Sequence, residues 1–428
     1  MAEKHKVLIL GGGFGGLYAA QALKHAPVDV TLIDHRNFHL FQPLMYQVAT
    51  GSLSPGEIAA PLRSVLSHQK NTQVLLGEAV DIDPDAKQVQ LKDGATIPYD
   101  SLIVATGSQS AYFGHDDWRE WAPSLKSVEE ATMIRHKILV AFEAAERTTD
   151  PAERTAWLTF VIVGAGATGV ELAGALGEIA LHTLKNDFRS IRPADARILV
   201  VDGGPRVLAG FPEDLSRKAE RSLLKLGARV RTGVMVTCID GHGVTIHTNA
   251  GSEHIPSRTV IWAAGVTASD FGRQLGKRTV AETDKSGRIK VNPDLTIANY
   301  PEIFVVGDLA FSTKPDGKPL PGVAQVAIQG GAYAAKTIVK RIKGEQDIEP
   351  FHYFDKGELA VIGRAAAVAK IRKLHLSGFI AWLIWLFIHL MYLVEFSNRL
   401  LVFIHWGFLY LTFNRGARLI TGAGGKES

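Results

Sequence analysis

Residues 11–16 read GGGFGG and residues 164–169 read GAGATG. Each stretch follows a short apolar run and precedes a helix-like segment, as in the first turn of a dinucleotide-binding βαβ unit. In the first stretch, Gly11 permits the tight turn, Gly13 lets the backbone approach a pyrophosphate, and Gly16 lets helix and strand pack closely. The helix that follows directs partial positive charge at the phosphates. The two turns therefore predict a protein that binds two dinucleotides.

The elements around the two turns recur in the same order, which indicates an internal duplication. The expected strands are residues 6–10, 28–33 and 101–105 around the first turn, and residues 158–163, 197–201 and 259–263 around the second. The third strand of each set is followed by a short stretch with glycine, Thr106-Gly107 or Ala264-Gly265. Strands alternating with helices predict an α/β fold with two Rossmann-like dinucleotide-binding domains.

An acidic residue ends the second strand of each unit, where it can accept a hydrogen bond from a ribose hydroxyl. These residues are Asp34 and Asp202. A carboxylate at Asp202 would repel the 2′-phosphate of NADPH, so the sequence favours NADH, although Arg206 lies nearby in the sequence. The gap before Asp202 is longer than usual because residues 180–195 are inserted.

Gly307-Asp308 ends a further expected strand and comes before a helix expected from Gly322 to Lys340. An acid at such a strand end either holds a ribityl hydroxyl of FAD or is an ordinary loop or capping residue. A helix that begins after Pro321-Gly322 would point its positive end at the pyrimidine edge of a flavin. Beside two dinucleotide units, the sequence favours the flavin.

Three polar residues have both a functional and a structural interpretation. Gln325 and Gln329 lie four residues apart on one helix face, where they can bind a quinone carbonyl or simply contact another domain. Glu171 follows the second glycine turn, where it can act between nicotinamide and flavin or be a first-turn acid that the helix dipole stabilises. The sequence alone leaves these alternatives open.

The single cysteine, Cys238, excludes a dithiol relay, since that chemistry needs two neighbouring thiols. Cys238 lies in an apolar strand pattern from Val234 to Ile239, so we expect it in the core. No metal site is predicted. The net charge of +4 is spread along the chain and does not indicate a nucleic-acid partner.

Two apolar segments lie near the end of the chain, at residues 376–394 and 400–413. The first carries no formal charge and would reach about 28 Å as a helix, nearly the thickness of a bilayer core. The second is too short to span. Flanking basic residues and scattered aromatic residues favour two helices lying in a membrane surface. A single spanning helix and a buried soluble hairpin are the alternatives.

The chain resembles the type II NADH dehydrogenases, which are single-chain, FAD-containing NADH:quinone oxidoreductases, over essentially its whole length. The most specific matching stretches are HLFQPLMYQVATGSLSPGEIAAPLR, which begins at His39, and PGVAQVAIQGG, which begins at Pro321. The others are VLILGGGFGGLYAA, LIVATGS, FVIVGAGATGVELAGAL, VIWAAGV, IFVVGDLA and the NRL-containing tail. One departure is Gly330, where relatives often carry Glu, and this puts acid-assisted quinone protonation at that position in doubt.

The resemblance implies a glutathione-reductase-like arrangement of three regions. These are an FAD-binding domain at residues 1–112 and 290–350, an NADH-binding domain at residues 155–285, and a membrane-anchoring and dimerisation region at residues 351–428. It also implies a homodimer bound peripherally to the cytoplasmic face of the bacterial inner membrane. A quinone tunnel is expected to open at the tail near Gln325 and Gln329.

The resemblance also implies the residues of each site. Those implied for FAD are Gly11, Gly13, Phe14, Gly15, Gly16, Asp34, His35, Gln42, Thr50, Val80, Ala105, Thr106, Gly107, Asp308, Ala324 and Gln325. Those implied for NADH are Gly164, Gly166, Ala167, Thr168, Gly169, Glu171, Asp202, Ala264 and Gly265. Glu171 matches the acid beside the nicotinamide, and the residues expected to act in catalysis are Glu171, Gln325 and Gln329.

These features predict hydride transfer from NADH C4 to flavin N5, after which two electrons and two protons pass to ubiquinone or menaquinone. Proton pumping is not expected, because it would require several spanning helices with internal ionisable relays. The alternative enzyme is a soluble NADH-dependent flavoprotein reductase of a protein acceptor. A flavoprotein that binds NADH as a redox sensor is the alternative without turnover.

Overall fold

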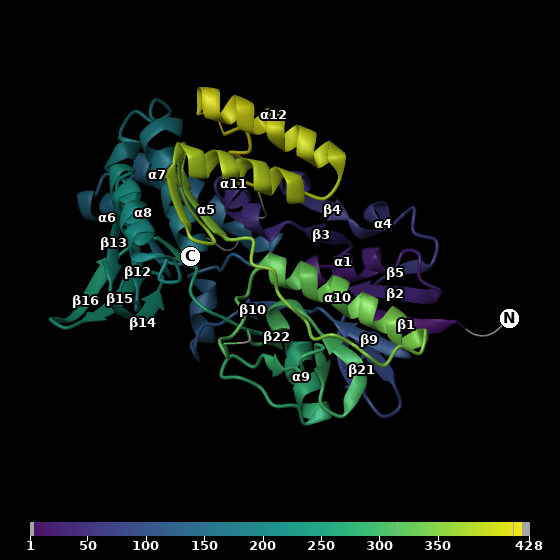
Figure 1. Cartoon of the computed structure of the whole chain (residues 1–428). Coiled ribbons are helices and arrows are strands. Elements are labelled where there is room, and N and C mark those ends of the chain that lie inside the picture. Colours follow the sequence, from purple (N-terminus) through teal and green to yellow (C-terminus); the bar gives the residue numbers. More distant parts are fainter. Residues whose placement is uncertain (1–3, 315, 414, 422–428) are drawn as a thin grey trace. The chain divides into compact units, whose positions relative to one another are not determined.

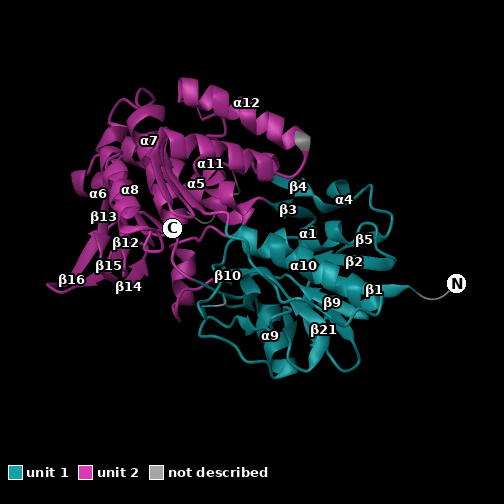
Figure 2. Ribbon diagram, in the orientation of Figure 1, with its two compact units in different colours: residues 1–40, 59–109, 266–355 teal, residues 41–58, 110–265, 356–428 magenta. Residues whose placement is uncertain are grey.

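The computed structural model describes residues 4–314, 316–413 and 415–421 (Figure 1). The chain divides into two compact units, coloured separately in Figure 2. Unit 1 comprises residues 1–40, 59–109 and 266–355, and unit 2 comprises residues 41–58, 110–265 and 356–428. Each unit contains its own largely parallel sheet, which confirms the α/β class with two Rossmann-like folds. The three functional regions proposed from the sequence stay a prediction.

Unit 1 is built on a six-stranded sheet in the order β20-β21-β9-β1-β2-β5. The strands are β1 (His5–Leu10), β2 (Val28–Asp34), β5 (Thr72–Leu76), β9 (Ser101–Val104), β20 (Thr296–Ile297) and β21 (Tyr300–Val305). All neighbours are parallel except β20 and β21. All four residues of β9 are buried, as expected for an interior strand of a parallel sheet.

Two helices of unit 1 pack against each other at glycines. They are α1 (Phe14–Ala22) and α10 (Ala324–Ile342). A Cβ added at Gly331 of α10 would overlap the carbonyl oxygen of Gly15 in α1, so the close approach requires glycine there. A small antiparallel sheet, formed by β6 (Ala79–Asp83), β7 (Gln88–Leu91) and β8 (Thr96–Pro98), precedes β9 along the chain.

Unit 2 repeats the plan with a four-stranded parallel sheet in the order β13-β12-β11-β17. Its strands are β11 (Thr159–Val163), β12 (Arg197–Asp202), β13 (Ala228–Thr232) and β17 (Thr259–Trp262). The helix after the glycine turn is α7 (Ala167–Glu178), which continues as one π-helical turn, Ile179–Thr183. The short helix α2 (Met45–Ala49) packs on α7 and on α5 (Val128–Arg147).

The structure contradicts the expectation for Cys238 and excludes one of the two alternatives for Glu171. Cys238 is exposed on β14 (Met235–Asp240), because the opposite face of that strand, with Ile239, contributes to the core. Glu171 is the fifth residue of α7, since the helix begins at Ala167. It is therefore not a first-turn acid stabilised by the helix dipole.

The apolar segments near the end of the chain form a strand and two helices of unit 2. The strand β25 (Leu374–Gly378) takes up the start of the first segment, so α11 covers only Phe379–Tyr392. The helix α12 (Phe396–Thr412) contacts α11, and both are yellow in Figure 1. Among the described residues, none of the helices combines the length and apolar character needed to cross a bilayer.

Candidate functional site

The first glycine turn is held open by its own backbone geometry. Gly11 has φ +100°, and a Cβ there would overlap the carbonyl oxygen of Ala105. The amide of Gly12 donates to Asp34 Oδ2 at 2.5 Å, and the amide of Arg36 donates to Asp34 Oδ1 at 2.7 Å. Asp34 therefore fixes the turn at the carboxyl end of β2.

The second turn repeats this arrangement in unit 2. Gly164 has φ +111°, and a Cβ there would lie 2.7 Å from the carbonyl carbon of Ala263. The amides of Ala165 and Gly204 donate to the two oxygens of Asp202, at 2.6 and 2.5 Å. The duplication inferred from the sequence thus includes the hydrogen bond from a backbone amide of each glycine turn to the carboxylate at the end of the second strand.

Both turns leave room for a phosphate. The helices α1 and α7 start from Gly13 and Gly166, and neither start carries a capping side chain among the described residues. A Cβ at either glycine would meet nothing within 4 Å. Open space before two helix N-termini, whose dipoles favour negative charge, suits a pyrophosphate, so the residues present fit FAD and NADH.

The remaining flavin residues predicted in unit 1 gather mainly at the carboxyl ends of neighbouring strands. Ala105 follows β9, and its amide donates to Leu10 O at 2.8 Å. Asp308 follows β21 and accepts a hydrogen bond from Ser108 Oγ at 2.9 Å. Thr106 Oγ1 lies 2.7 Å from Ser269 Oγ. Cofactors of open parallel sheets bind at this edge, so the arrangement is compatible with the predicted flavin site, which stays a prediction.

Other predicted flavin residues are more scattered. Val80 is exposed on β6, in the separate antiparallel sheet of unit 1. His35 is exposed, with Nδ1 3.3 Å from Asp34 Oδ1. Gln42 is exposed and Thr50 is buried, and both belong to unit 2. Their roles stay predictions.

The first turns of α10 contain both predicted quinone-binding glutamines. Gln325 is the second residue of the helix and is partly buried. Gln329 pairs with the backbone of Phe354, donating to its carbonyl at 3.0 Å and accepting from its amide at 2.9 Å. Gln329 therefore anchors the chain that follows α10, and its Nε2 carries a second hydrogen that can be donated to a quinone carbonyl without breaking these bonds.

The predicted nicotinamide site contains an acid with a perturbed titration. Glu171 is partly buried on α7, and packing of protein around its carboxyl raises its pKa to about 8. An amide hydrogen bond from Val361 opposes this increase and is outweighed by desolvation. Glu171 therefore carries a proton at neutral pH and can donate a hydrogen bond.

The structure adds buried residues that sequence patterns did not identify. His39 is buried next to the first turn, and its Nδ1 lies 2.9 Å from the carbonyl oxygen of Gly12. In unit 2, Gln47 donates to the phenol oxygen of Tyr46 at 2.9 Å and accepts from Trp406 Nε1 at 2.8 Å. His39, Tyr46 and Gln47 lie in the specific HLFQPLMYQVATG stretch. No spacing rule of the sequence connects them with Trp406.

Comparison with known proteins gives the family. The pyridine nucleotide-disulphide oxidoreductase family matches residues 5–331, and the NDH2 C-terminal domain matches residues 356–412. The type II NADH:quinone oxidoreductase Ndh of Mycobacterium tuberculosis is 47% identical over 425 residues, covering 98% of this chain and 91% of the relative. The chain belongs to the type II NADH:quinone oxidoreductases.

More distant relatives agree with this family. The type II NADH:quinone oxidoreductase of Staphylococcus aureus strain MW2 is 30% identical over 88% of this chain and 92% of its own length. The solved NDH2 of Plasmodium falciparum in complex with NADH superposes with a TM-score of 0.87 at 20% identity, covering 98% of this chain and all of that one. The sulfide:quinone oxidoreductase of Aquifex aeolicus reaches 0.75 at 20% identity, over 92% and 91%. These two structures confirm the fold.

Proposed function

We propose that this type II NADH:quinone oxidoreductase binds FAD at residues 11–16 and NADH at residues 164–169. The observation that carries the assignment is the pair of matching turns, of which the first lies beside Asp308 at the edge of the same sheet. The reaction is oxidation of NADH and reduction of a quinone. When bound, FAD would supply the hydride acceptor and the two-electron donor for this reaction.

The chain's own residues bind and orient the nucleotides in this proposal. The amides at the start of α1 and α7 neutralise the two pyrophosphates, while Asp34 and Asp202 accept from ribose hydroxyls. Arg206 Nη2 donates to the carbonyls of Ala209 and Phe211, which holds this guanidinium against its own loop and away from a role as a free cation for a 2′-phosphate. The protonated carboxyl of Glu171 orients the nicotinamide and holds a proton beside it.

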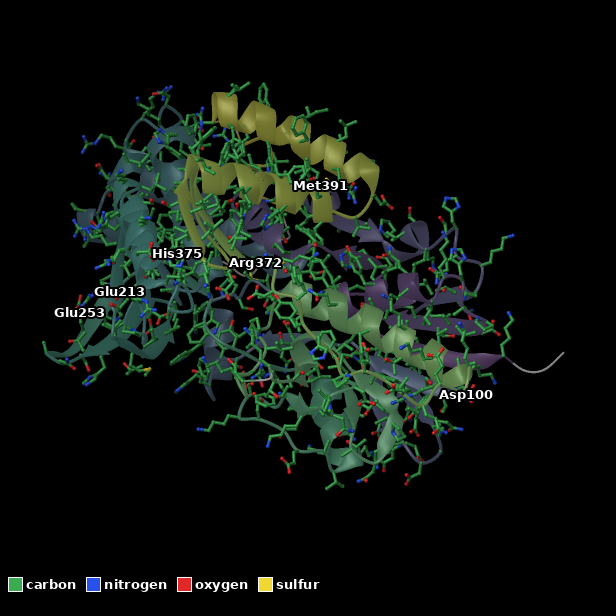
Figure 3. The ribbon with its side chains drawn as sticks, in the orientation of Figure 1. Asp100, Glu213, Glu253, Arg372, His375 and Met391 are labelled. Carbon is green, nitrogen blue, oxygen red and sulfur yellow. The ribbon has the colours of Figure 1, made fainter. Side chains whose placement is uncertain are left out.

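The helices α11 and α12 support attachment to a membrane surface. Each buries a narrow face, with Trp385 and Trp406 inside, and leaves many large apolar side chains exposed. The exposed set is Phe379, Ile380, Leu383, Phe387, Met391, Leu400, Leu401, Phe403, Ile404, Phe408 and Leu411, of which Met391 is labelled in Figure 3. So large an apolar surface suits interfacial insertion beside a lipid-soluble quinone.

The family resemblance further supports a homodimer at the cytoplasmic face of the inner membrane. Light scattering of the detergent-solubilised protein should give twice the chain mass of 46.4 kDa. A single-chain mass at the same concentration would contradict this assembly.

Two matched substitutions test which turn binds which nucleotide. Gly13 and Gly166 both have extended backbones and open space at Cβ, so valine is expected to fold at either position. Gly13→Val should be purified without the visible absorbance of flavin. Gly166→Val should keep the flavin but resist its reduction by NADH. Loss of flavin from Gly166→Val and not from Gly13→Val would reverse the assignment.

A further inference from the structure

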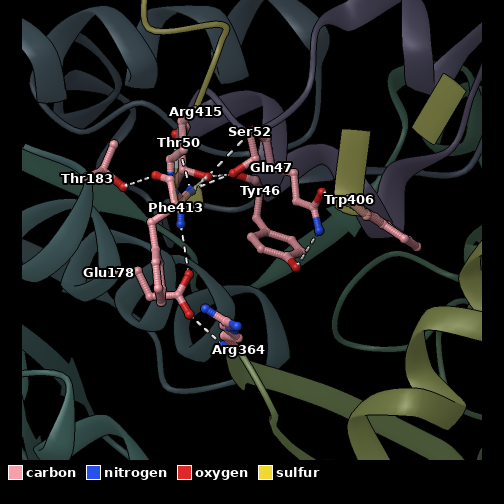
Figure 4. A network of polar contacts seen from close by, with 10 residues as sticks. All are labelled: Tyr46, Gln47, Thr50, Ser52, Glu178, Thr183, Arg364, Trp406, Phe413 and Arg415. Atoms are coloured by element: carbon pink, nitrogen blue, oxygen red, sulfur yellow. Dashed lines mark hydrogen bonds and ion pairs between the residues drawn. The ribbon is translucent and has the colours of Figure 1, made fainter. Parts of the chain in front are cut away.

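A buried arginine near the end of the chain has no role in the site described so far. Arg415 is 3% exposed and lies in the polar network of unit 2 shown in Figure 4. Its Nη1 donates to Ser52 Oγ at 2.6 Å, to Thr50 Oγ1 at 3.0 Å and to Thr50 O at 3.3 Å. Its Nη2 donates to Glu178 Oε2 at 2.9 Å. One guanidinium thus joins the residues after α2 to the last residue of α7.

The other contacts of this network hold the arginine in place. The second carboxylate oxygen of Glu178 accepts from the backbone amide of Arg364. Thr183 Oγ1 donates to the carbonyl of Phe413 at 3.2 Å, and Ala417 N donates to Gly51 O at 3.2 Å. The chain after α12 is therefore anchored on both sides of Arg415.

Arg415 connects the two helices that meet at the proposed nicotinamide residue. Thr50 caps the C-terminus of α2, and its hydroxyl donates to the carbonyl of Tyr46 at 2.9 Å. Glu178 and Glu171 are seven residues apart, on one face of α7. The phenol of Tyr46 is buried within electrostatic reach of both acids.

The chemistry of the contact requires arginine in particular. Three acceptors on the α2 side and a carboxylate on the α7 side match the planar fork of a guanidinium, whereas an ammonium is a single point charge. The charged or titratable groups that face Arg415 are Glu178, Tyr46 and Tyr410. Removing the arginine would leave the largely buried Glu178 without its side-chain counter-charge.

We propose that Arg415 is a positioning residue of the NADH site, which holds Tyr46 of α2 against the face of α7 that carries Glu171 and so excludes water from that carboxyl. The proposal rests on the role proposed above for Glu171. The groups that face Glu171 are the phenol of Tyr46 on α2 and the amide of Val361 on β23 (Glu358–Gly363). Loss of Arg415 would separate α2 from α7 and hydrate the acid.

The test is the pH profile of flavin reduction by NADH, measured by anaerobic stopped flow on the full-length protein with bound FAD. The unsubstituted protein should show an ionisation near pH 8, and Arg415→Met should lower its pH by about one unit or more. Arg415→Lys should give a smaller shift. The matched control is Arg418→Met, because Arg418 lies in the same segment but pairs with the more exposed Asp187.

The pH profiles of the variants decide whether Arg415 positions the NADH site. An unshifted profile in Arg415→Met with full flavin content overturns the proposal, and so does an equal shift in the Arg418→Met control. If Arg415→Met does not fold, Thr50→Val with Ser52→Ala decides, since it removes the side-chain acceptors on the α2 side and keeps the ion pair. An unshifted profile there also overturns the proposal. If Glu171→Gln leaves the ionisation in place, the proposed role of Glu171 fails instead.

Discussion

At the scale of single residues, the strand-end acids were predictable and their surroundings were not. Asp34 and Asp202 follow from their position after an apolar run, because a βαβ unit places an acid there. The hydrogen bonds of Arg206 could not be predicted. Its partners are the backbone carbonyls of Ala209 and Phe211, and the direction of these carbonyls depends on the folded loop. The exposure of Cys238 depends likewise on which face of β14 meets the core.

Coenzyme preference should follow from Asp202. The carboxylate repels a 2′-phosphate and Arg206 is tied to its own loop through Nη2, so kcat/KM for NADH should exceed that for NADPH by about tenfold or more, a difference of about 1.4 kcal/mol. Asp202→Asn should reduce the ratio of kcat/KM for NADH to kcat/KM for NADPH. Steady-state rates with both coenzymes measure it, and an equal or higher value for NADPH in the unsubstituted protein would contradict the assignment.

Glu171 should make stability depend on pH. Its pKa is raised to about 8 in the folded protein, whereas an unfolded glutamate ionises near 4.3. Its contribution to stability is therefore fully present below about pH 4 and is lost as the pH rises to about 8. Thermal unfolding should show Glu171→Gln losing less stability than the unsubstituted protein between pH 5 and pH 8. Parallel curves for the two proteins would show that Glu171 is not desolvated.

At the scale of helices and strands, periodicity located nearly every element around the two turns. It did not locate the end of β25, where Gly378 adopts φ +71° and lets α11 begin only at Phe379. One apolar run of residues 376–394 therefore becomes a strand end and a short helix. Hydropathy identifies the apolar run. The change from strand to helix within it depends on the pairing of β25 with β24 (Ala366–Ile371), which hydropathy does not describe.

The packing of α1 against α10 gives a matched pair of glycine substitutions. A Cβ at Gly331 would overlap Gly15 O, whereas a Cβ at Gly330 has its nearest neighbour, Leu295 Cδ1, at 3.5 Å. Gly331→Ala should destabilise unit 1 by about 1–3 kcal/mol and reduce flavin content, while Gly330→Ala should resemble the unsubstituted protein. Denaturant unfolding and flavin absorbance report both effects. Equal behaviour of the two variants would mean that the helices do not approach so closely.

The exposed face of α12 predicts how the protein attaches to membranes. Phe403 and Leu411 are 61% and 81% exposed, so glutamates at both positions should release the protein from vesicles while NADH:ferricyanide activity is retained. Leu224→Glu on α8 (Glu213–Lys225) is the control, because Leu224 is a similarly exposed apolar residue on another helix. Vesicle flotation measures binding. Binding that survives both charges would place the attachment elsewhere.

At the scale of the whole molecule, the duplication and the family were both predictable, because short glycine turns and specific stretches reveal them. The Arg415 network was not predictable, since it joins residues 50, 52, 178 and 415 through contacts that no local pattern encodes. Similarity to the NDH2 C-terminal domain also ends at residue 412, before this arginine. The site residues most dependent on tertiary structure were therefore the ones that the sequence missed.

The central claim is that the chain passes electrons from NADH through bound FAD to a quinone. Anaerobic stopped-flow spectroscopy of the full-length protein tests it most directly. We predict that one equivalent of NADH bleaches the flavin absorbance and that a quinone then restores it at a rate sufficient for turnover. Flavin that NADH leaves oxidised, or reduced flavin that quinone fails to reoxidise, would contradict the account.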